Sequence, residues 1–311
     1  MRRNLVALGV GLTALTAGAV ILRTAQARRQ IGPIGRFLAV DGVRLHYTEF
    51  GSGEPIVLLH GNGSLIQEFL ASGLVDRLAR DHRVILFDRP GYGFSQRPRG
   101  RAWSPAAQAN LFRQAVRQLG VDEVHLLGHS WGTLVAMEWA LRHPASVVSV
   151  SALSGYFFPT FRPDVALASI PAVPIIGDLM RHTIVPLLAR LVWPKLLRDL
   201  FGPAATPPRF HEVPRALMLA PRALGASAEE SALMIPAAQA LQGRYAGLRA
   251  RLLIMAGEGD RIVDPAQQSR RLHERLPGSQ LVVIEGAGHL FHHTELAKTA
   301  AAIVAFTRSG T

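Results

Sequence analysis

The sequence predicts an α/β fold: a doubly wound, mostly parallel sheet with an inserted helical cap. The main observation is a set of short, continuous apolar runs, which are typical of strands buried on both faces. Helical patterns such as 65–80, 106–119, 134–142 and 265–276 separate several of these runs, and such alternation favours a parallel sheet. The runs span residues 56–59, 84–87, 124–127, 147–153, 252–255 and 281–284.

Two further stretches complete the predicted architecture. Residues 37–50 alternate around Asp41-Gly42, which predicts a β-hairpin ahead of the first buried strand. Residues 156–243 break the strand–helix rhythm with many prolines between short apolar segments. We interpret this stretch as a cap of short helices inserted into a core formed by residues 31–155 and 244–311.

Composition narrows the function classes. Of the 311 residues, 49% are hydrophobic and 18% charged, which is typical of a packed globular domain. The formal net charge is +12, but no run of Lys and Arg is interleaved with aromatic residues, so no nucleic-acid partner is expected. The sequence has no cysteine, which excludes disulfides, thiol catalysis and cysteine-ligated metals.

Residues 1–30 are predicted to be a membrane anchor or a signal segment. An uncharged apolar run spans residues 5–22 between basic flanks, and as a helix it would reach about 27 Å, close to the thickness of the bilayer hydrocarbon. We expect a single-pass anchor, with the membrane as a partner and the catalytic domain outside the cytoplasm. Two alternatives stay open: cleavage after Ala25-Gln26-Ala27, which would release the domain, and a buried core helix.

The motif Gly128-His129-Ser130-Trp131-Gly132 follows the apolar run 124–127 and precedes a helical pattern. This is the strand–turn–helix setting of a G-x-S-x-G nucleophile elbow. Glycine is required on both sides because the sharp turn brings the flanking backbones too close for side chains. We therefore predict Ser130 as a catalytic nucleophile; the alternative, a serine in an ordinary turn, is disfavoured by this context.

A serine hydroxyl needs an adjacent base at neutral pH. His289 follows the last apolar run in Gly286-Ala287-Gly288-His289, and loops after strand ends collect functional groups in α/β sheets. We predict His289 as the base. The rivals His292 and His293 fall at the start of the predicted final helix.

The base in turn needs an acid that orients it and stabilises its charged form. Asp260 follows the apolar run 252–255 and is predicted as this acid. Its competitors are Glu258 and Asp264. Asp264 immediately precedes Pro265, where a helix-capping carboxylate is expected.

The tetrahedral intermediate of acyl transfer needs hydrogen-bond donors for its oxyanion. The backbone N–H of Trp131 directly follows the nucleophile. A second donor is expected in His60-Gly61-Asn62-Gly63, after the run 56–59, and we predict the backbone N–H of Asn62. His60 is predicted to be structural, with a hydrogen bond inside this loop.

Taken together and in this order, these motifs resemble the α/β-hydrolase superfamily over nearly everything after about residue 36. The match includes Asp88-Arg89-Pro90-Gly91-Tyr92-Gly93-Phe94-Ser95 after the second buried run. The resemblance implies a serine hydrolase whose cap occupies the proline-rich stretch. It also implies that Asp88 and Ser95 stabilise their loop and take no part in the chemistry.

Asn62 and the Gly-His-x-Trp-Gly frame also resemble haloalkane dehalogenases, which carry aspartate at the position of Ser130. A serine cannot form their alkyl-ester intermediate, so dehalogenation is set aside, and the same reason argues against soluble epoxide hydrolases. Cofactor-free C–C bond hydrolases and serine-type haloperoxidases share the triad and stay open.

The favoured hypothesis is a carboxylic-ester hydrolase acting on an apolar acyl substrate through an acyl-enzyme. The alternatives are a C–C bond hydrolase and a non-catalytic binding member of the same fold, because fold alone does not establish function. The complete triad favours an enzyme. No metal or organic cofactor is expected, since the triad carries out acyl transfer unaided.

Overall fold

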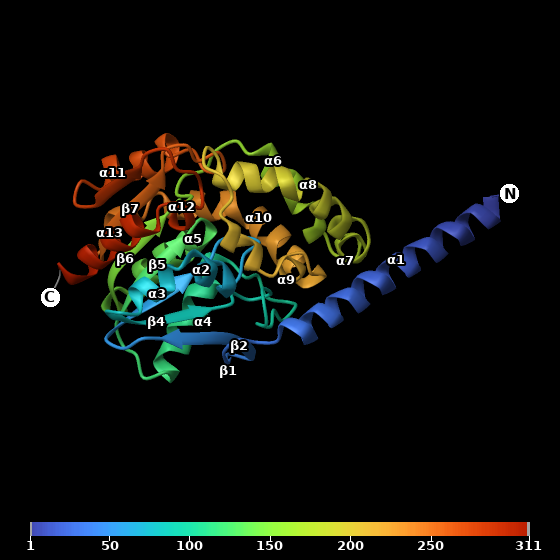
Figure 1. Ribbon diagram of the computed structural model, residues 1–311, viewed down its shortest axis with the longest axis horizontal. Helices are drawn as coiled ribbons and strands as arrows, with labels where there is room; N and C mark the ends of the chain where they lie inside the picture. Colours follow the sequence, from blue (N-terminus) through green and yellow to red (C-terminus); the bar gives the residue numbers. More distant parts are fainter. Residues whose placement is uncertain (1, 310–311) are drawn as a thin grey trace.

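The computed structural model describes the backbone of residues 2–309 and the side chains of residues 11–309. Its centre is an eight-stranded sheet in the order β1-β2-β4-β3-β5-β6-β7-β8 (Figure 1). The β1–β2 and β2–β4 pairs are antiparallel, and the other pairs are parallel, which confirms the predicted fold class. The strands are β1 (Arg36–Val40), β2 (Val43–Phe50), β3 (Glu54–Leu59), β4 (His82–Phe87), β5 (Val124–His129), β6 (Val147–Leu153), β7 (Arg251–Gly257) and β8 (Gln280–Ile284).

The first two strands form the predicted hairpin. Val40 pairs with Val43, so only two residues make the turn. These residues, Asp41 and Gly42, have φ values of 48° and 72°, the left-handed conformations that a two-residue type I′ turn requires. The hairpin adds its antiparallel strands at one edge of the sheet, beside β4.

Helices cover both faces of the sheet, as a doubly wound topology requires. Phe112 and Trp139 belong to the apolar layer on one face, and Phe69 and Ile303 to the layer on the other. The helices that contribute to these layers are α2 (Ile66–Ser72), α3 (Leu74–Leu78), α4 (Pro105–Gln118), α5 (Trp131–Arg142), α11 (Arg271–Arg275), α12 (Phe291–Thr294) and α13 (Leu296–Arg308).

Two of the helix predictions were wrong in detail. The pattern 65–80 predicted one helix, but the chain forms α2 and α3 with a break at Gly73, whose φ of 79° is a left-handed conformation that ends α2. The pattern 265–276 forms a π-helical turn at Ala266–Arg270 followed by α11.

Between β6 and β7 the chain forms five α-helices and contributes no strand to the sheet (Figure 1). We call residues 163–241 the helical segment. Pro163 and Pro221 open two of its helices, where a missing N–H does no harm. Its helices are α6 (Pro163–Ser169), α7 (Ile176–His182), α8 (Ile184–Phe201), α9 (Arg215–Met218) and α10 (Pro221–Leu241), with 3₁₀ turns at Ile170–Ala172 and Pro208–Glu212.

The N-terminal helix α1 (Arg2–Ile31) projects from the rest of the molecule and lies near α7 and α9 only through its C-terminal part (Figure 1). Among the residues searched, which are the described ones, no single helix is long and apolar enough to cross a membrane; Pro163–Ala172 and Ile176–His182, bent by 95°, reach that length and hydropathy only as a pair. The expected anchor, residues 5–22, falls partly on residues 5–10, whose side chains lie outside those described.

Candidate active site

Ser130 lies between the end of β5 and the start of α5, at the sharp turn that the sequence predicts. Its φ of 52° is unusual for a residue with a side chain and marks a strained backbone. Hydrogen bonds hold this conformation: the Ser130 N–H donates to the Leu153 carbonyl over 2.8 Å, and the Ser130 carbonyl accepts from the Thr133 N–H over 3.0 Å.

The two glycines of the elbow are needed for close backbone contacts. A Cβ atom at Gly128 would lie 2.7 Å from the Gly132 carbonyl oxygen, and a Cβ atom at Gly132 would collide with the Leu59 carbonyl oxygen at the end of β3. The side chain of Ser130 is partly exposed, unlike those of its neighbours His129 and Trp131. The local sequence thus presents a hydroxyl at the carboxyl end of the sheet.

His289 and Asp260 lie together on neighbouring loops after β8 and β7. The distance from His289 Nδ1 to Asp260 Oδ2 is 2.7 Å, and both side chains are almost completely buried. The other carboxylate oxygen of Asp260 accepts the backbone N–H groups of Ile262 and Val263, at 2.8 and 2.9 Å. Both carboxylate oxygens of Asp260 thus accept hydrogen bonds, and the acid holds the histidine ring through Nδ1. Within the part of the chain that the structure describes, His289 Nε2 makes no hydrogen bond.

The elbow and the histidine loop are in contact. His129 Nε2 donates to the His289 carbonyl over 3.2 Å, and the Ser154 hydroxyl donates to the same oxygen over 2.9 Å. Among the described residues, no hydrogen bond joins the Ser130 hydroxyl to His289. Such bonds are often long in the absence of a substrate and tighten in the complex.

The rival residues are committed to other contacts. Asp264 Oδ1 accepts the Ala266 N–H over 2.8 Å at the start of the π-helical turn, as expected for a capping carboxylate. Glu258 is exposed to solvent. His292 and His293 both direct Nε2 to Glu68 on α2, at 2.5 and 2.7 Å.

The Glu68 cluster could not be predicted from the sequence, because Glu68 is more than 220 positions from the two histidines. Burial alone would raise the pKa of the Glu68 carboxyl, but the hydrogen bonds and charges of the two histidines outweigh it and hold that pKa well below its usual range. The three groups are of metal-ligating type. The two histidine Nε2 atoms lie 2.5 and 2.7 Å from Glu68 Oε1, however, whereas two ligand atoms of one zinc ion lie about 3 Å or more apart. The distances are therefore those of direct hydrogen bonds.

The loop predicted to supply the second oxyanion donor lies beside the elbow: a Cβ atom at Gly61 would come within 3.2 Å of the Ser130 Cβ. The Asn62 side chain points to α10, where its Nδ2 donates to the Ser227 carbonyl at 3.2 Å and to the Ser231 hydroxyl at 3.3 Å. These bonds fix the side chain of Asn62 and leave the backbone of the loop to face Ser130.

His60 has the structural role that the sequence predicts. Its Nδ1 donates to the Gly61 carbonyl over 2.9 Å, and its Nε2 accepts the Arg89 N–H over 3.0 Å. Burial, followed by the charge of Arg89, lowers the pKa of His60 to about 4, so the ring is neutral at physiological pH. Asp88 likewise stabilises its loop, because its carboxylate accepts the N–H groups of Ile66 and Phe94 and pairs with His46.

A buried ion pair behind the loop of Asn62 is the main feature that the sequence did not predict. The Arg89 guanidinium pairs with both carboxylate oxygens of Glu230 on α10, and neither side chain is exposed. The same guanidinium donates to the carbonyls of His60 and Gly61, at 2.8 and 2.9 Å. Tyr92 donates to Glu230 over 2.7 Å. Arg89 thus connects the loop of Asn62 to helix α10.

Comparison with known proteins places this arrangement in a family. The profile of the alpha/beta hydrolase fold family matches residues 54–296, which is most of the chain. The chain therefore belongs to the α/β-hydrolase fold family, and its relatives include hydrolases.

A 2-hydroxy-6-oxo-2,4-heptadienoate hydrolase of Pseudomonas putida is 28% identical over 260 residues, which cover 82% of this chain and 90% of the relative. Among solved structures, a membrane phospholipase A described as a bacterial virulence factor is 25% identical with a TM-score of 0.69, and the alignment covers 99% of both chains. An esterase of Thermogutta terrifontis shares the fold with a TM-score of 0.74, at 22% identity, over 89% of this chain and 99% of the esterase.

Proposed function

We propose that this hydrolase cleaves a carboxylic ester of an apolar acyl group through an acyl-enzyme on Ser130. The observation that carries the proposal is the buried Asp260–His289 pair, at 2.7 Å, beside a serine on a strained elbow. A binding module has no need of an acid, a base and an exposed hydroxyl together.

In the proposed reaction, Ser130 Oγ attacks the ester carbonyl carbon while His289 Nε2 accepts the hydroxyl proton. Asp260 keeps the proton of His289 on Nδ1 and stabilises the positive ring. His289 then gives the proton to the leaving alcohol oxygen, which breaks the ester bond. A water molecule then attacks the acyl carbon while the same nitrogen takes its proton. The bond from this carbon to Ser130 Oγ breaks, the nitrogen returns the proton to Oγ, and the acid leaves.

The negative oxygen of the tetrahedral intermediate is proposed to accept the backbone N–H groups of Trp131 and Asn62. Trp131 is the first residue of α5, whose first turn carries no acidic side chain, so the positive end of the helix dipole also faces this oxygen. Arg89 supports the second donor from behind by fixing the carbonyls of His60 and Gly61.

We propose residues 156–243 as the cap over the site and residues 31–155 and 244–311 as the hydrolase core. The apolar substrate preference rests on one cluster of the helical segment with the core loops. Trp193 and Phe201 of α8 and Phe210 pack in one apolar cluster with Leu65 and Leu290, which lie three residues after Asn62 and one after His289. We expect the acyl chain of a bound substrate to pack against these side chains where it extends beyond Ser130.

A C–C bond hydrolase of the same fold remains the second candidate. It is favoured by the heptadienoate hydrolase relative, which this chain covers over 90% of its length. Its reaction uses the same three residue types, so the site residues alone do not separate the two activities.

Two assays test the proposal on the full-length protein in detergent. A fluorophosphonate probe should label Ser130, and the Ser130→Ala variant should not be labelled; a wild-type protein that resists the probe contradicts both enzyme hypotheses. Nitrophenyl esters of increasing chain length and a vinylogous diketone then separate the reactions. Ester turnover without diketone cleavage supports the esterase, and the reverse result supports the C–C hydrolase.

We also propose that α1 anchors the protein in a membrane, with the catalytic domain outside the cytoplasm. Leu12, Leu15 and Leu22 are more than 65% exposed on this helix, and contact with a bilayer would remove this apolar surface from water. The membrane phospholipase A whose whole length aligns with this chain supports the same proposal. The full-length protein should resist extraction from membranes by carbonate. A soluble product that begins at Arg28 would instead identify a cleaved signal, and a soluble uncleaved product would contradict both.

A further inference from the structure

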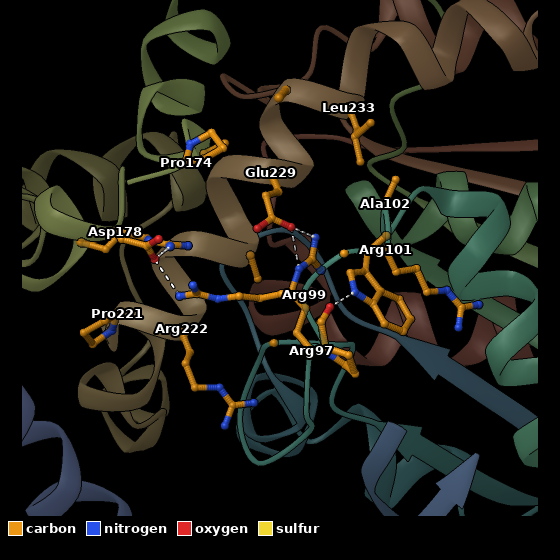
Figure 2. A pocket seen from close by; sticks show the side chains of 18 of the residues that line it. Arg97, Arg99, Arg101, Ala102, Pro174, Asp178, Pro221, Arg222, Glu229 and Leu233 are labelled. Atoms are coloured by element: carbon orange, nitrogen blue, oxygen red, sulfur yellow. Dashed lines mark hydrogen bonds and ion pairs between the residues drawn. The ribbon is translucent and has the colours of Figure 1, made fainter. Parts of the chain in front are cut away.

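A cavity of about 680 Å³ lies between the loop after β4 and the helical segment (Figure 2). None of the five predicted site residues lines it. Its walls are the loop residues 97–103, α7 and α10. This volume lies within the range of small-molecule pockets, and such pockets are common where two parts of a protein meet.

The cavity is strongly basic. With histidine neutral, five positive charges and two negative charges on the lining side chains leave a net charge of +3. The charged residues are Arg97, Arg99, Arg101, Arg181 and Arg222, with Asp178 and Glu229.

The two carboxylates neutralise only part of this charge. Asp178 is shared by two guanidinium groups: that of Arg99, at 2.9 Å, and that of Arg181 (Figure 2). Glu229 pairs with Arg97 at 2.6 Å on the other side of the cavity (Figure 2). The side chain of Arg99 is 85% exposed, so its charge remains available to a ligand.

Arg222 adds positive charge that no carboxylate neutralises among the described residues. Its guanidinium donates to the Ser95 carbonyl. Burial, followed by the positive charges of Arg28 and Arg44, lowers the pKa of Arg222. The Arg222 guanidinium thus points away from Asp178, whereas Arg99 and Arg181 share that carboxylate and keep one positive charge in excess between them (Figure 2).

An aliphatic wall completes the cavity, with the ring of Trp103 buried behind Arg101. The Arg101 guanidinium stacks over the Trp103 ring at 4.6 Å and pairs on its outer side with Asp41. Ala102 and Leu233 line the same cavity. A ligand therefore meets guanidinium groups on one side and carbon atoms on another.

We propose that this cavity binds a phosphate monoester through Arg99 and Arg181, with its organic group against Ala102 and Leu233. A phosphate monoester carries about −1.5 to −2 charges near neutral pH and three acceptor oxygens, which matches a surplus of several guanidinium groups better than a single carboxylate does. The planar guanidinium fork donates two parallel hydrogen bonds to such oxygens.

The bound phosphate is distinct from the proposed ester substrate, because α10 separates the two sites. Ala226, Glu229 and Leu233 of this helix line the cavity. The Ser227 carbonyl, Glu230 and the Ser231 hydroxyl face the oxyanion loop and its supports instead.

The test is calorimetric titration of the full-length protein in detergent micelles at low salt, with glycerol 3-phosphate as the soluble probe and glycerol as the uncharged control. A second arm uses micelles that contain phosphatidic acid, against phosphatidylcholine. Saturable binding of glycerol 3-phosphate that weakens with added salt supports a soluble ligand. Binding of phosphatidic acid alone supports a lipid headgroup.

Matched variants assign the binding to the cavity. Arg99→Gln should weaken binding about tenfold, since it removes one charge-assisted contact. Arg117→Gln removes the same charge from an exposed position on α4 and should leave binding unchanged. Glu229→Gln removes a competing carboxylate and should tighten binding severalfold, a gain that a damaged fold would not produce.

Three outcomes overturn the proposal. One is the absence of saturable binding to either phosphate probe. The second is equal weakening by Arg99→Gln and Arg117→Gln, which would indicate attraction to the overall charge of the protein. The third is weaker binding by Glu229→Gln when its unfolding midpoint matches that of the wild type.

Discussion

The loops that follow β5, β7 and β8 differ sharply from the helical segment in how their side chains are held. In the loops, Asp260 is buried and makes three hydrogen bonds, and Ser130 is fixed through its own backbone. In the helical segment, Ile175 and Leu191 are 84% and 77% exposed. Reacting groups need fixed positions, whereas a surface that meets an apolar partner needs only exposed carbon.

Helix α10 is the part of the helical segment that shares the character of the core. Glu230 is fully buried and paired with Arg89, while its neighbour Glu229 is 39% exposed and paired with Arg97. One turn of helix thus carries an ion pair that supports the oxyanion loop and another that borders the basic cavity. The difference shows that the boundary between core and helical segment runs through α10.

The largest effect is expected at the nucleophile. Ser130→Ala should lower kcat by about a millionfold, because the remaining groups cannot form an acyl-enzyme. His289→Ala should be about as damaging. Ester hydrolysis is the measurement, and an unchanged unfolding midpoint is the control. More than a few per cent of the activity left in Ser130→Ala would show that another residue is the nucleophile.

The two aspartates after β7 give the next largest effect. Asp260→Asn should lower kcat by about ten-thousandfold, since an amide cannot hold the correct tautomer of His289 or stabilise its charge. Asp264→Asn is the matched control and should retain near wild-type activity, because Asp264 only caps a helical turn. If the order of the two variants is reversed, the acid is Asp264.

The two glutamates of α10 test the boundary itself. Glu230→Gln leaves the buried Arg89 without its counter-charge and should lower the free energy of unfolding by about 4 kcal/mol. Glu229→Gln breaks a partly exposed pair and should cost less than about 1 kcal/mol. Urea denaturation measures both values. Equal losses would mean that both faces of α10 are held with the same strength.

The sequence predicted the parts of the fold and of the site that depend on local chain geometry. The elbow, the hairpin turn and the capping role of Asp264 each involve residues within a few positions of one another, and their glycines and turns are visible in the pattern. The strands were predicted because burial on both faces of a parallel sheet requires continuous apolar runs.

The contacts that support the site could not be predicted in this way. Arg89 and Glu230 are 141 positions apart, and Asn62 and Ser231 are 169 apart. Each of these side chains alone is compatible with an exposed surface. Only the packing of α10 against the oxyanion loop brings them together, and that packing depends on the course of the whole helical segment.

The last prediction concerns the dependence of stability on pH, and it tests the buried side of the comparison. Burial and the charge of Arg89 lower the pKa of His60 to about 4 in the folded protein. The pKa of a histidine exposed to solvent, as in the unfolded chain, is 6.5. Between these values the unfolded chain binds more protons than the folded one, so acid favours unfolding. The contribution of His60 to stability is therefore complete above pH 6.5 and falls as the pH is lowered to 4, by about 3 kcal/mol for this one residue.

His60→Gln should be less stable at neutral pH, because it loses the imidazole hydrogen bonds, but its free energy of unfolding should change less between pH 6.5 and pH 4. Urea titrations of both proteins across this interval measure the difference. Parallel curves would show that His60 is protonated without opening the loop, and that the oxyanion loop is held less firmly than its contacts indicate.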